Sequence, residues 1–199
     1  ASGIGGLRKL RQHPNGLLLE PNQPGDYLGK RVHTVSGKVE LAPADLVARA
    51  ATLEDAYQNA LDNLDELRLI QKRERFTHNS WAHNAAAFVK GEHSSNYLYI
   101  HPQDAQARTL ADGDSARVSA SGRHIDVPVR IDPDMLPGTI SVPHGWGHQR
   151  ASGLRIARRT TGVNVNIIMP DGPQALEPGS GMAHMNGVLA RVSPTPVQR

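Results

Sequence analysis

The 199-residue chain contains no cysteine, and this absence excludes several kinds of chemistry. A polypeptide without thiols has no disulfide framework, no Cys-type zinc site, no iron–sulfur ligation and no thiol nucleophile. No apolar run approaches the roughly 18 to 20 residues of a membrane span, and no signal-peptide segment opens the chain. We therefore expect no membrane span and a cytoplasmic location. Because the chain begins with Ala1 rather than Met, we expect a processed or excised piece, although tag removal would look the same.

Aromatic residues are also scarce, at 4% of the chain, whereas there are 19 Gly and 14 Pro. This balance fits a turn-rich β domain better than a helical bundle. Charged residues make up 21% of the chain, a content that argues against wholesale disorder. The length is sufficient for one large domain, or for one domain with an appendage, and for a sizeable core.

The hydrophobic pattern predicts many short strands and a few helices. Ile125, Val127 and Val129 alternate with polar residues or proline, as in a half-buried strand. Helices are expected from the apolar stripe over 53–64 and from the prolines that open 43–50 and 102–108. A hairpin is expected over 31–41, with its turn at Ser36-Gly37. Further strands are expected at 67–70, 96–100, 115–120, 123–131, 139–142 and 188–192. Together these elements predict a mainly β fold with some α, closed into a barrel.

Negative charge is missing from one long segment. No Asp or Glu occurs from Met135 to Pro170, although four Arg and two His fall there. A basic segment rich in Gly suits a bound anion, most commonly phosphate, and a solvated basic surface is the alternative. The formal net charge of +3 is too small to indicate a nucleic-acid partner.

Three polar clusters interrupt the β-rich half of the chain. Cluster 1 is THNSWAHN at 77–84, cluster 2 is PHGWGHQ at 143–149, and cluster 3 is GVNVN at 162–166, followed by SGM at 180–182 and NG at 186–187. Amide side chains pair donors with acceptors and suit the edge of a flat heterocycle. Glycine lets backbone N–H groups approach a ligand closely. With the acid-free Arg segment, the clusters predict a polar heterocycle that carries phosphate; alternatively, such loops satisfy their own backbone.

The same clusters give little support to catalysis. His144 and His148 have helical metal-ligand spacing, but Gly145 and Gly147 lie between them and no H-E-x-x-H glutamate is present. Ser80 lies near two histidines but outside any G-x-S-x-G elbow. No phosphate-binding loop motif occurs. We therefore assign no catalytic residue and no metal ligand.

The order of these motifs resembles the C-terminal molybdopterin-dinucleotide-binding domain of molybdopterin oxidoreductases, the dimethyl-sulfoxide-reductase superfamily that includes formate dehydrogenases and nitrate reductases. The resemblance covers about residues 73–192 and is most specific over the segment from Ile100-His101-Pro102 to Val118. It implies a six-stranded double-psi β-barrel that closes over molybdopterin guanine dinucleotide. By position, the implied cofactor-binding residues are Thr77, His78, Asn79, Ser80, Trp81, His83, His144, Gly145, Trp146, Gly147, His148, Asn164, Asn166 and Asn186.

The resemblance also implies a division of the chain. Residues 1–72 would be a linker or edge region with a hairpin and a helix, 73–193 the barrel, and 194–199 a flexible tail. In this family the protein ligand of the metal and any iron–sulfur cysteines lie in earlier domains, which this chain lacks. We therefore expect a cofactor-binding domain of a molybdenum or tungsten oxidoreductase, with the metal ligated outside this chain and no activity alone.

The partners of this chain would then be the remaining domains of the parent catalytic subunit and the cofactor. We expect no nucleic-acid partner. This hypothesis predicts that the three clusters converge at one end of the barrel. Two alternatives stay open: a free-standing β-barrel binding or interaction module without a redox role, and a metal-dependent hydrolase that uses His144 and His148.

Overall fold

The computed structural model describes residues 6–18, 21, 23–26, 30–63 and 65–196. The chain divides into two compact units, Ala1–Ala51 and Thr52–Arg199. The first contains α1 (Gly6–Leu10) and α2 (Ala44–Arg49), and a 3-10 turn (Ala50–Thr52) leads to α3 (Leu53–Asp62). The two longer helices lie where proline and the apolar stripe predicted them. None of the helices among the described residues is long and apolar enough to cross a membrane.

The hairpin predicted over residues 31–41 does not form. The turn is present, since Thr34 Oγ1 donates to the Lys38 carbonyl at 2.6 Å and Gly37 N donates to the Thr34 carbonyl. However, residues 30–41 are all described and none of them is in a strand. Val35 and Val39, which would face a core, are exposed. The prediction was wrong because a lone pair of strands with nothing to pack against is marginally stable.

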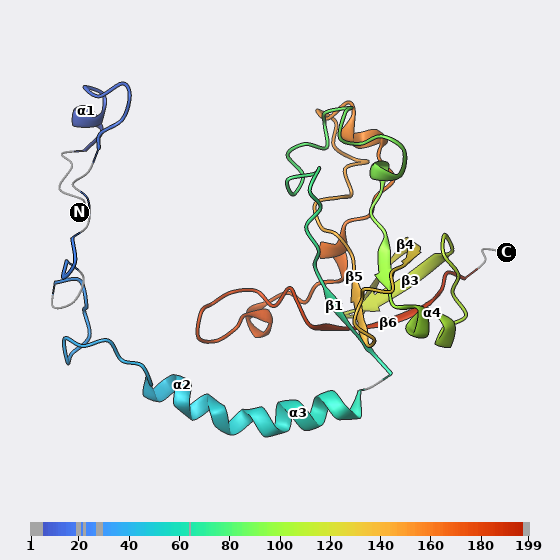
Figure 1. The fold of residues 1–199 in the computed structure, drawn as a ribbon, viewed down its shortest axis with the longest axis horizontal. Helices are drawn as coiled ribbons and strands as arrows, with labels where there is room; N and C mark the ends of the chain where they lie inside the picture. Colours follow the sequence, from blue (N-terminus) through green and yellow to red (C-terminus); the bar gives the residue numbers. More distant parts are fainter. Residues whose placement is uncertain (1–5, 19–20, 22, 27–29, 64, 197–199) are drawn as a thin grey trace. The chain divides into compact units, whose positions relative to one another are not determined.

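The second unit contains a closed barrel of six strands. They are β1 (Leu67–Ile70), β2 (Leu98–Ile100), β3 (Ser115–Ala120), β4 (Arg123–Ile131), β5 (Thr139–Ser141) and β6 (Val188–Pro194). Around the barrel they follow the order β1-β5-β2-β4-β3-β6 (Figure 1). The β1–β5 and β2–β4 pairs are parallel and the other pairs are antiparallel. The predicted fold class, mainly β with some α around a six-stranded barrel, is confirmed.

The barrel core consists of the inward-facing residues of these strands. In β4, the alternating residues Ile125, Val127 and Val129 are buried, as the period-two pattern predicts. Leu67 and Leu69 of β1 are equally buried, so the barrel begins at residue 67, before the expected boundary at 73. Burying one such side chain, compared with leaving it exposed to water, adds about 1.5–3 kcal/mol to the free energy of unfolding.

The expected flexible tail is only partly described. Thr195 N donates to the Ser115 carbonyl at 2.9 Å, and the two hydroxyl oxygens lie 2.9 Å apart. The chain is therefore attached to β3 as far as residue 195, and residues 197–199 lie outside the described part.

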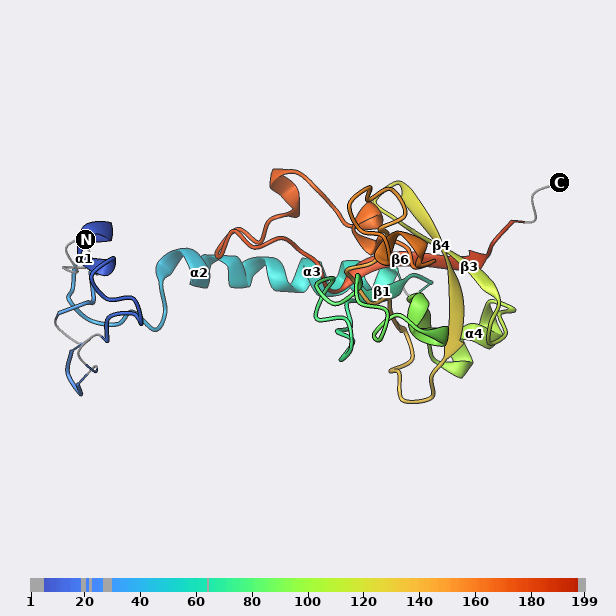
Figure 2. The same ribbon diagram turned by 90° about the horizontal axis from the view of Figure 1, so that it is seen from above.

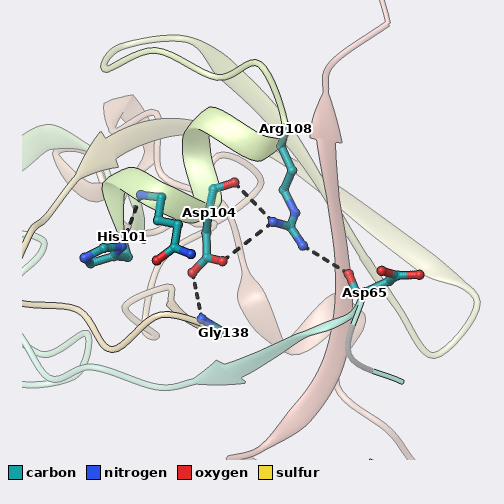
Figure 3. A network of polar contacts seen from close by, with 6 residues as sticks. Asp65, His101, Asp104, Arg108 and Gly138 are labelled. Atoms are coloured by element: carbon teal, nitrogen blue, oxygen red, sulfur yellow. Dashed lines mark hydrogen bonds and ion pairs between the residues drawn. The ribbon is translucent and has the colours of Figure 1, made fainter. Parts of the chain in front are cut away.

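A polar network fastens α4 (Pro102–Ala107) to the starts of two strands (Figure 3). Asp104 Oδ2 accepts from Gly138 N, just before β5, at 2.7 Å. Arg108 donates to the Asp104 carbonyl at 3.1 Å and to the Asp65 carbonyl, just before β1, at 3.0 Å. Because β1 and β5 are parallel, their carboxyl ends lie at the same edge. Clusters 1 and 2 follow these two ends, and both segments extend from the barrel on the same side (Figure 1).

Candidate functional site

Clusters 1 and 2 are in direct contact. His144 Nε2 lies 2.9 Å from Asn79 Oδ1, and the Gly145 backbone packs against the Asn79 carbonyl. A Cβ at Gly145 would collide with that carbonyl oxygen. Glycine is also favoured there because its φ is +92°. The first glycine of cluster 2 is thus required by the close approach of the two loops.

Two consecutive residues of cluster 1 have left-handed backbone. His78 has φ +44° and Asn79 has φ +63°. Asn tolerates this region, whereas for most residues it costs roughly 1–2 kcal/mol. Backbone strain of this kind concentrates at binding and catalytic sites. Here the turn places the Asn79 side chain against His144.

His83 and His148 form a second bridge between the two clusters. His83 is fully buried, and its Nδ1 lies 3.0 Å from His148 Nε2. His148 Nε2 also lies 2.7 Å from the Gly145 carbonyl, which only accepts, so this nitrogen carries the hydrogen. His83 Nδ1 must then be the acceptor. Burial, together with the charge of the nearby His148, lowers the pKa of His83 to about 4, so His83 is neutral near pH 7.

Trp146 lies at the centre of the three clusters. It is buried, its ring centroid is 4.2 Å from that of His83, and its Nε1 donates to Glu74 Oε2 at 3.2 Å. Burial raises the pKa of Glu74, and the hydrogen bond from Trp146 opposes this shift. A Cβ at Gly162 of cluster 3 would collide with the Trp146 ring. The indole therefore joins cluster 2 to cluster 3.

Two amide side chains hold cluster 3 against cluster 2. Asn96 is fully buried; its Nδ2 donates to the Pro143 and Val163 carbonyls at 2.8 and 3.0 Å, and its Oδ1 accepts from Val163 N at 2.9 Å. Gln149 Nε2 donates to the Thr160 and Gly162 carbonyls at 3.1 and 2.7 Å. Sequence reasoning did not select Asn96, Gln149 or Glu74 as site residues, because their partners lie in other loops.

A cavity of about 570 Å³ lies between clusters 2 and 3 and the start of β4. Gly147, Gly162 and Asn164 line it, and Arg150 brings a positive charge to it. Gly147 has φ +98°, and a Cβ there would collide with Asn164. The walls also include Asp126, whose carboxylate is paired with Arg117 at 2.8 Å. They thus offer closely approaching backbone, an amide and the guanidinium of Arg150, which suit a polar heterocycle with an anionic group.

The remaining predicted residues are placed differently. Thr77 is buried and donates to the Glu74 carbonyl at 3.3 Å, whereas Trp81 is 84% exposed. Asn164 Oδ1 accepts from Asn166 N at 3.0 Å, and Asn166 itself is exposed. Several amides therefore serve their own backbone, as the alternative interpretation proposed.

Asn186, in the last part of cluster 3, lies at the end of β1, apart from clusters 1 and 2 and from residues 162–166 of cluster 3. Its Oδ1 accepts from Gln71 N at 2.8 Å. Both views show residues 171–187 as a separate loop that projects from the barrel (Figures 1 and 2). The Leu176–Ala183 bridge closes this loop on itself. Asn186 thus has a structural contact with β1, and its role in ligand binding stays a prediction.

Two histidines of clusters 1 and 2 each have a ring nitrogen without a hydrogen-bond partner. His83 Nε2 and His144 Nδ1 are buried and have no hydrogen-bond partner within the described chain. Because His144 Nε2 donates to Asn79, its Nδ1 is an acceptor. Burial lowers the pKa of His144, and the charge of Arg73 adds to this, so the ring is neutral. One buried donor and one buried acceptor therefore have no partner within the described chain.

His144 and His148 have no third metal ligand beside them among the described residues. The two imidazoles have different hydrogen-bond partners. Across the part of the chain that the structure describes, no group of three or more His, Asp or Glu side chains could hold a metal ion. The hydrolase hypothesis therefore lacks its metal-binding set within these residues.

Comparison with known proteins gives one family and a structural relative. The model of the family described as the molydopterin dinucleotide binding domain matches residues 67–189. The structure of acetylene hydratase from Pelobacter acetylenicus is similar, with a TM-score of 0.59 and 22% sequence identity, over 81% of this chain and 24% of that chain. At that identity the likeness concerns the fold alone. The chain spans about a quarter of the length of that enzyme, and no curated protein matches it.

Proposed function

Because this chain belongs to the molybdopterin-dinucleotide-binding domain family, we propose that its three loop clusters hold molybdopterin guanine dinucleotide for a molybdenum or tungsten oxidoreductase. The metal would be ligated outside this chain, so the domain would bind and orient the cofactor without being active alone. The cofactor supplies the redox chemistry when it is bound, and the protein supplies binding, orientation and electrostatics.

The observation that carries this proposal is the convergence of the clusters. Asn79, His83, Trp146 and Gly162 connect clusters 1, 2 and 3 into one continuous set of loops. Clusters 2 and 3 border an open cavity of about 570 Å³, within the range of 300–1,000 Å³ that is usual for small-molecule sites. The alternative of clusters on opposite faces of the barrel does not agree with these contacts.

The donor set suits a heterocycle rich in N–H and C=O groups. His144 Nδ1 and His83 Nε2 have no partner within the described chain, and we propose that the first accepts from a ring N–H and the second donates to a ring oxygen or nitrogen when the loops open to the ligand. Gly147 lets its backbone lie close against Asn164, where a Cβ would collide. Arg150 lies at the same cavity and favours an anionic substituent.

The partners would be the other domains of a larger catalytic subunit. The structural relative is about four times longer than the matched region, and the family is named for binding a cofactor. Trp81, 84% exposed within cluster 1, is an apolar surface that such a domain would cover. A cytoplasmic location stays a prediction.

The direct test is calorimetric titration of the chain with metal-free molybdopterin guanine dinucleotide. We expect saturable, weak and salt-sensitive binding, because one domain provides only part of the site. Gly147→Val would push a side chain against Asn164 at the wall of the cavity and should weaken binding by about tenfold or more. Gly153→Val, at an open position of the same segment, is the matched control. Absence of saturable binding at low salt, or wild-type affinity in Gly147→Val, would contradict the proposal. Stronger competition by GDP than by CDP would support the guanine form.

A further inference from the structure

Three arginines form a cationic hollow outside the cavity described above. Arg155, Arg158 and Arg159 line a depression of about 490 Å³. Arg159 also borders a neighbouring hollow of about 280 Å³, with Lys90 on its wall. Four cationic side chains from two segments of the chain thus surround adjoining spaces.

The backbone that carries these arginines is fixed by cluster 1. Asn84 Oδ1 accepts from the N–H groups of Ile156 and Ala157 at 2.9 and 3.3 Å, at the start of a short 3-10 turn (Ala157–Arg159). Ala157 is fully buried, and Thr160 Oγ1 donates to its carbonyl at 2.7 Å. The arginines therefore project from an anchored turn rather than from a loose loop. Asn84 thus has a structural role that its place in cluster 1 did not reveal.

The charge of this hollow is not neutralised from within the described chain. No carboxylate among the described residues makes an ion pair with Arg155, Arg158 or Arg159, although other surface arginines, such as Arg130 and Arg191, have acidic partners. No Asp or Glu occurs in the surrounding segment from Met135 to Pro170. Three like charges held close together repel each other unless an anion compensates them.

We propose that Arg155, Arg158 and Arg159 bind a pyrophosphate group. Guanidinium groups bind phosphate oxygens with paired, charge-assisted hydrogen bonds, and three of them match a group with two adjacent phosphates. The anion site depends only on the geometry of the hollow. Its assignment to the pyrophosphate of a bound dinucleotide rests on the proposed function.

Titration of the chain with inorganic pyrophosphate, followed by amide NMR shifts, tests the anion site. We expect saturable shifts confined to residues 154–160 at about 20 mM salt, strongly weakened at about 300 mM. The triple variant Arg155→Gln, Arg158→Gln, Arg159→Gln should weaken binding by about tenfold or more. The control is Arg8→Gln, Lys9→Gln, Arg11→Gln, which removes the same charge from three closely spaced positions on and beside α1. Thermal unfolding of both variants checks that each stays folded.

The outcomes separate this proposal from the proposed function. Equal weakening by both triple variants, or shifts spread over all basic surfaces, would overturn the anion site and show non-specific attraction. If inorganic pyrophosphate binds but the dinucleotide does not, the anion site stands and the cofactor assignment fails. If the dinucleotide binds and the arginine variant leaves its affinity unchanged, the assignment of its pyrophosphate to this hollow is wrong. Pyrophosphate shifts that do not saturate would also overturn the anion site.

Discussion

The Nδ1 atom of the fully buried His83 lies 3.0 Å from the Nε2 atom of His148, in a contact between two segments that are 65 residues apart. The burial of His83 makes this contact sensitive to acid. Since burial lowers the pKa of His83 to about 4, below the 6.5 or so of an unfolded histidine, the unfolded chain binds a proton that the folded chain does not.

The unfolding free energy should therefore fall as the pH decreases from about 6.5 to about 4, by an amount on the order of 2–3 kcal/mol. His83→Gln removes this titration and should flatten the curve over that range. The exposed His33→Gln variant should keep the wild-type slope. Urea unfolding at several pH values gives the unfolding free energy of all three proteins as a function of pH. Equal slopes for His83→Gln and wild type would show that His83 does not cause the pH dependence of stability.

Gly145→Ala should destabilise the domain by about 2 kcal/mol or more. The new Cβ would collide with the Asn79 carbonyl oxygen, and φ +92° is unfavourable for alanine. Gly153→Ala has open space and an ordinary backbone, so it should change stability by no more than about 0.5 kcal/mol. Chemical denaturation compares the two; similar stabilities would mean that the loops do not meet at Gly145.

Asn96→Ala should lower the unfolding free energy by roughly 2–4 kcal/mol, because it removes three hydrogen bonds and leaves buried backbone groups of Pro143 and Val163 without partners. The control is Asn59→Ala, at an exposed position of α3. Hydrogen exchange at Val163 N provides a local readout, and should rise much more than exchange in the barrel strands. A loss below about 0.5 kcal/mol would contradict the role of Asn96 as the link between clusters 2 and 3.

His78→Gly should stabilise the chain, by up to about 1 kcal/mol, by relieving the left-handed backbone at φ +44°. Thr109→Gly, at φ +56° and outside the site, should do the same. If the His78 side chain contacts the ligand, as the resemblance implies, only His78→Gly should also weaken dinucleotide binding. Thermal unfolding and titration of both variants separate strain from binding, and equal affinities would remove His78 from the site.

Much of the fold could be predicted because the barrel strands follow simple alternation. Ile125, Val127 and Val129 are buried as their spacing predicts, and the turns between strands coincide with glycine. The same alternation failed at Val35 and Val39, which no described residue of their unit covers. Local pattern predicts a strand only where another element buries its apolar face.

The site was predictable only in its outline. Clusters 1 and 2 meet because they follow the carboxyl ends of β1 and β5, which pair in parallel. The order of the motifs predicted that the clusters converge, through the resemblance to a known domain. Asn96 and Glu74 could not be found in this way, because Asn96 bonds to a carbonyl 47 residues away and Glu74 to an indole 72 residues away. The left-handed backbone at His78 and Asn79 could not be predicted either, because neither residue is glycine, the residue that usually marks this conformation in a sequence.

The measurement that tests the central claim most directly is amide NMR shift mapping of the chain during titration with metal-free molybdopterin guanine dinucleotide. The account predicts saturable shifts at residues 77–84, 143–149 and 162–166, with the indole N–H of Trp146 among them and residues 115–120 of β3 little affected. Saturable shifts at other surfaces, or no shifts at the three clusters when the dinucleotide is in large excess, would contradict it.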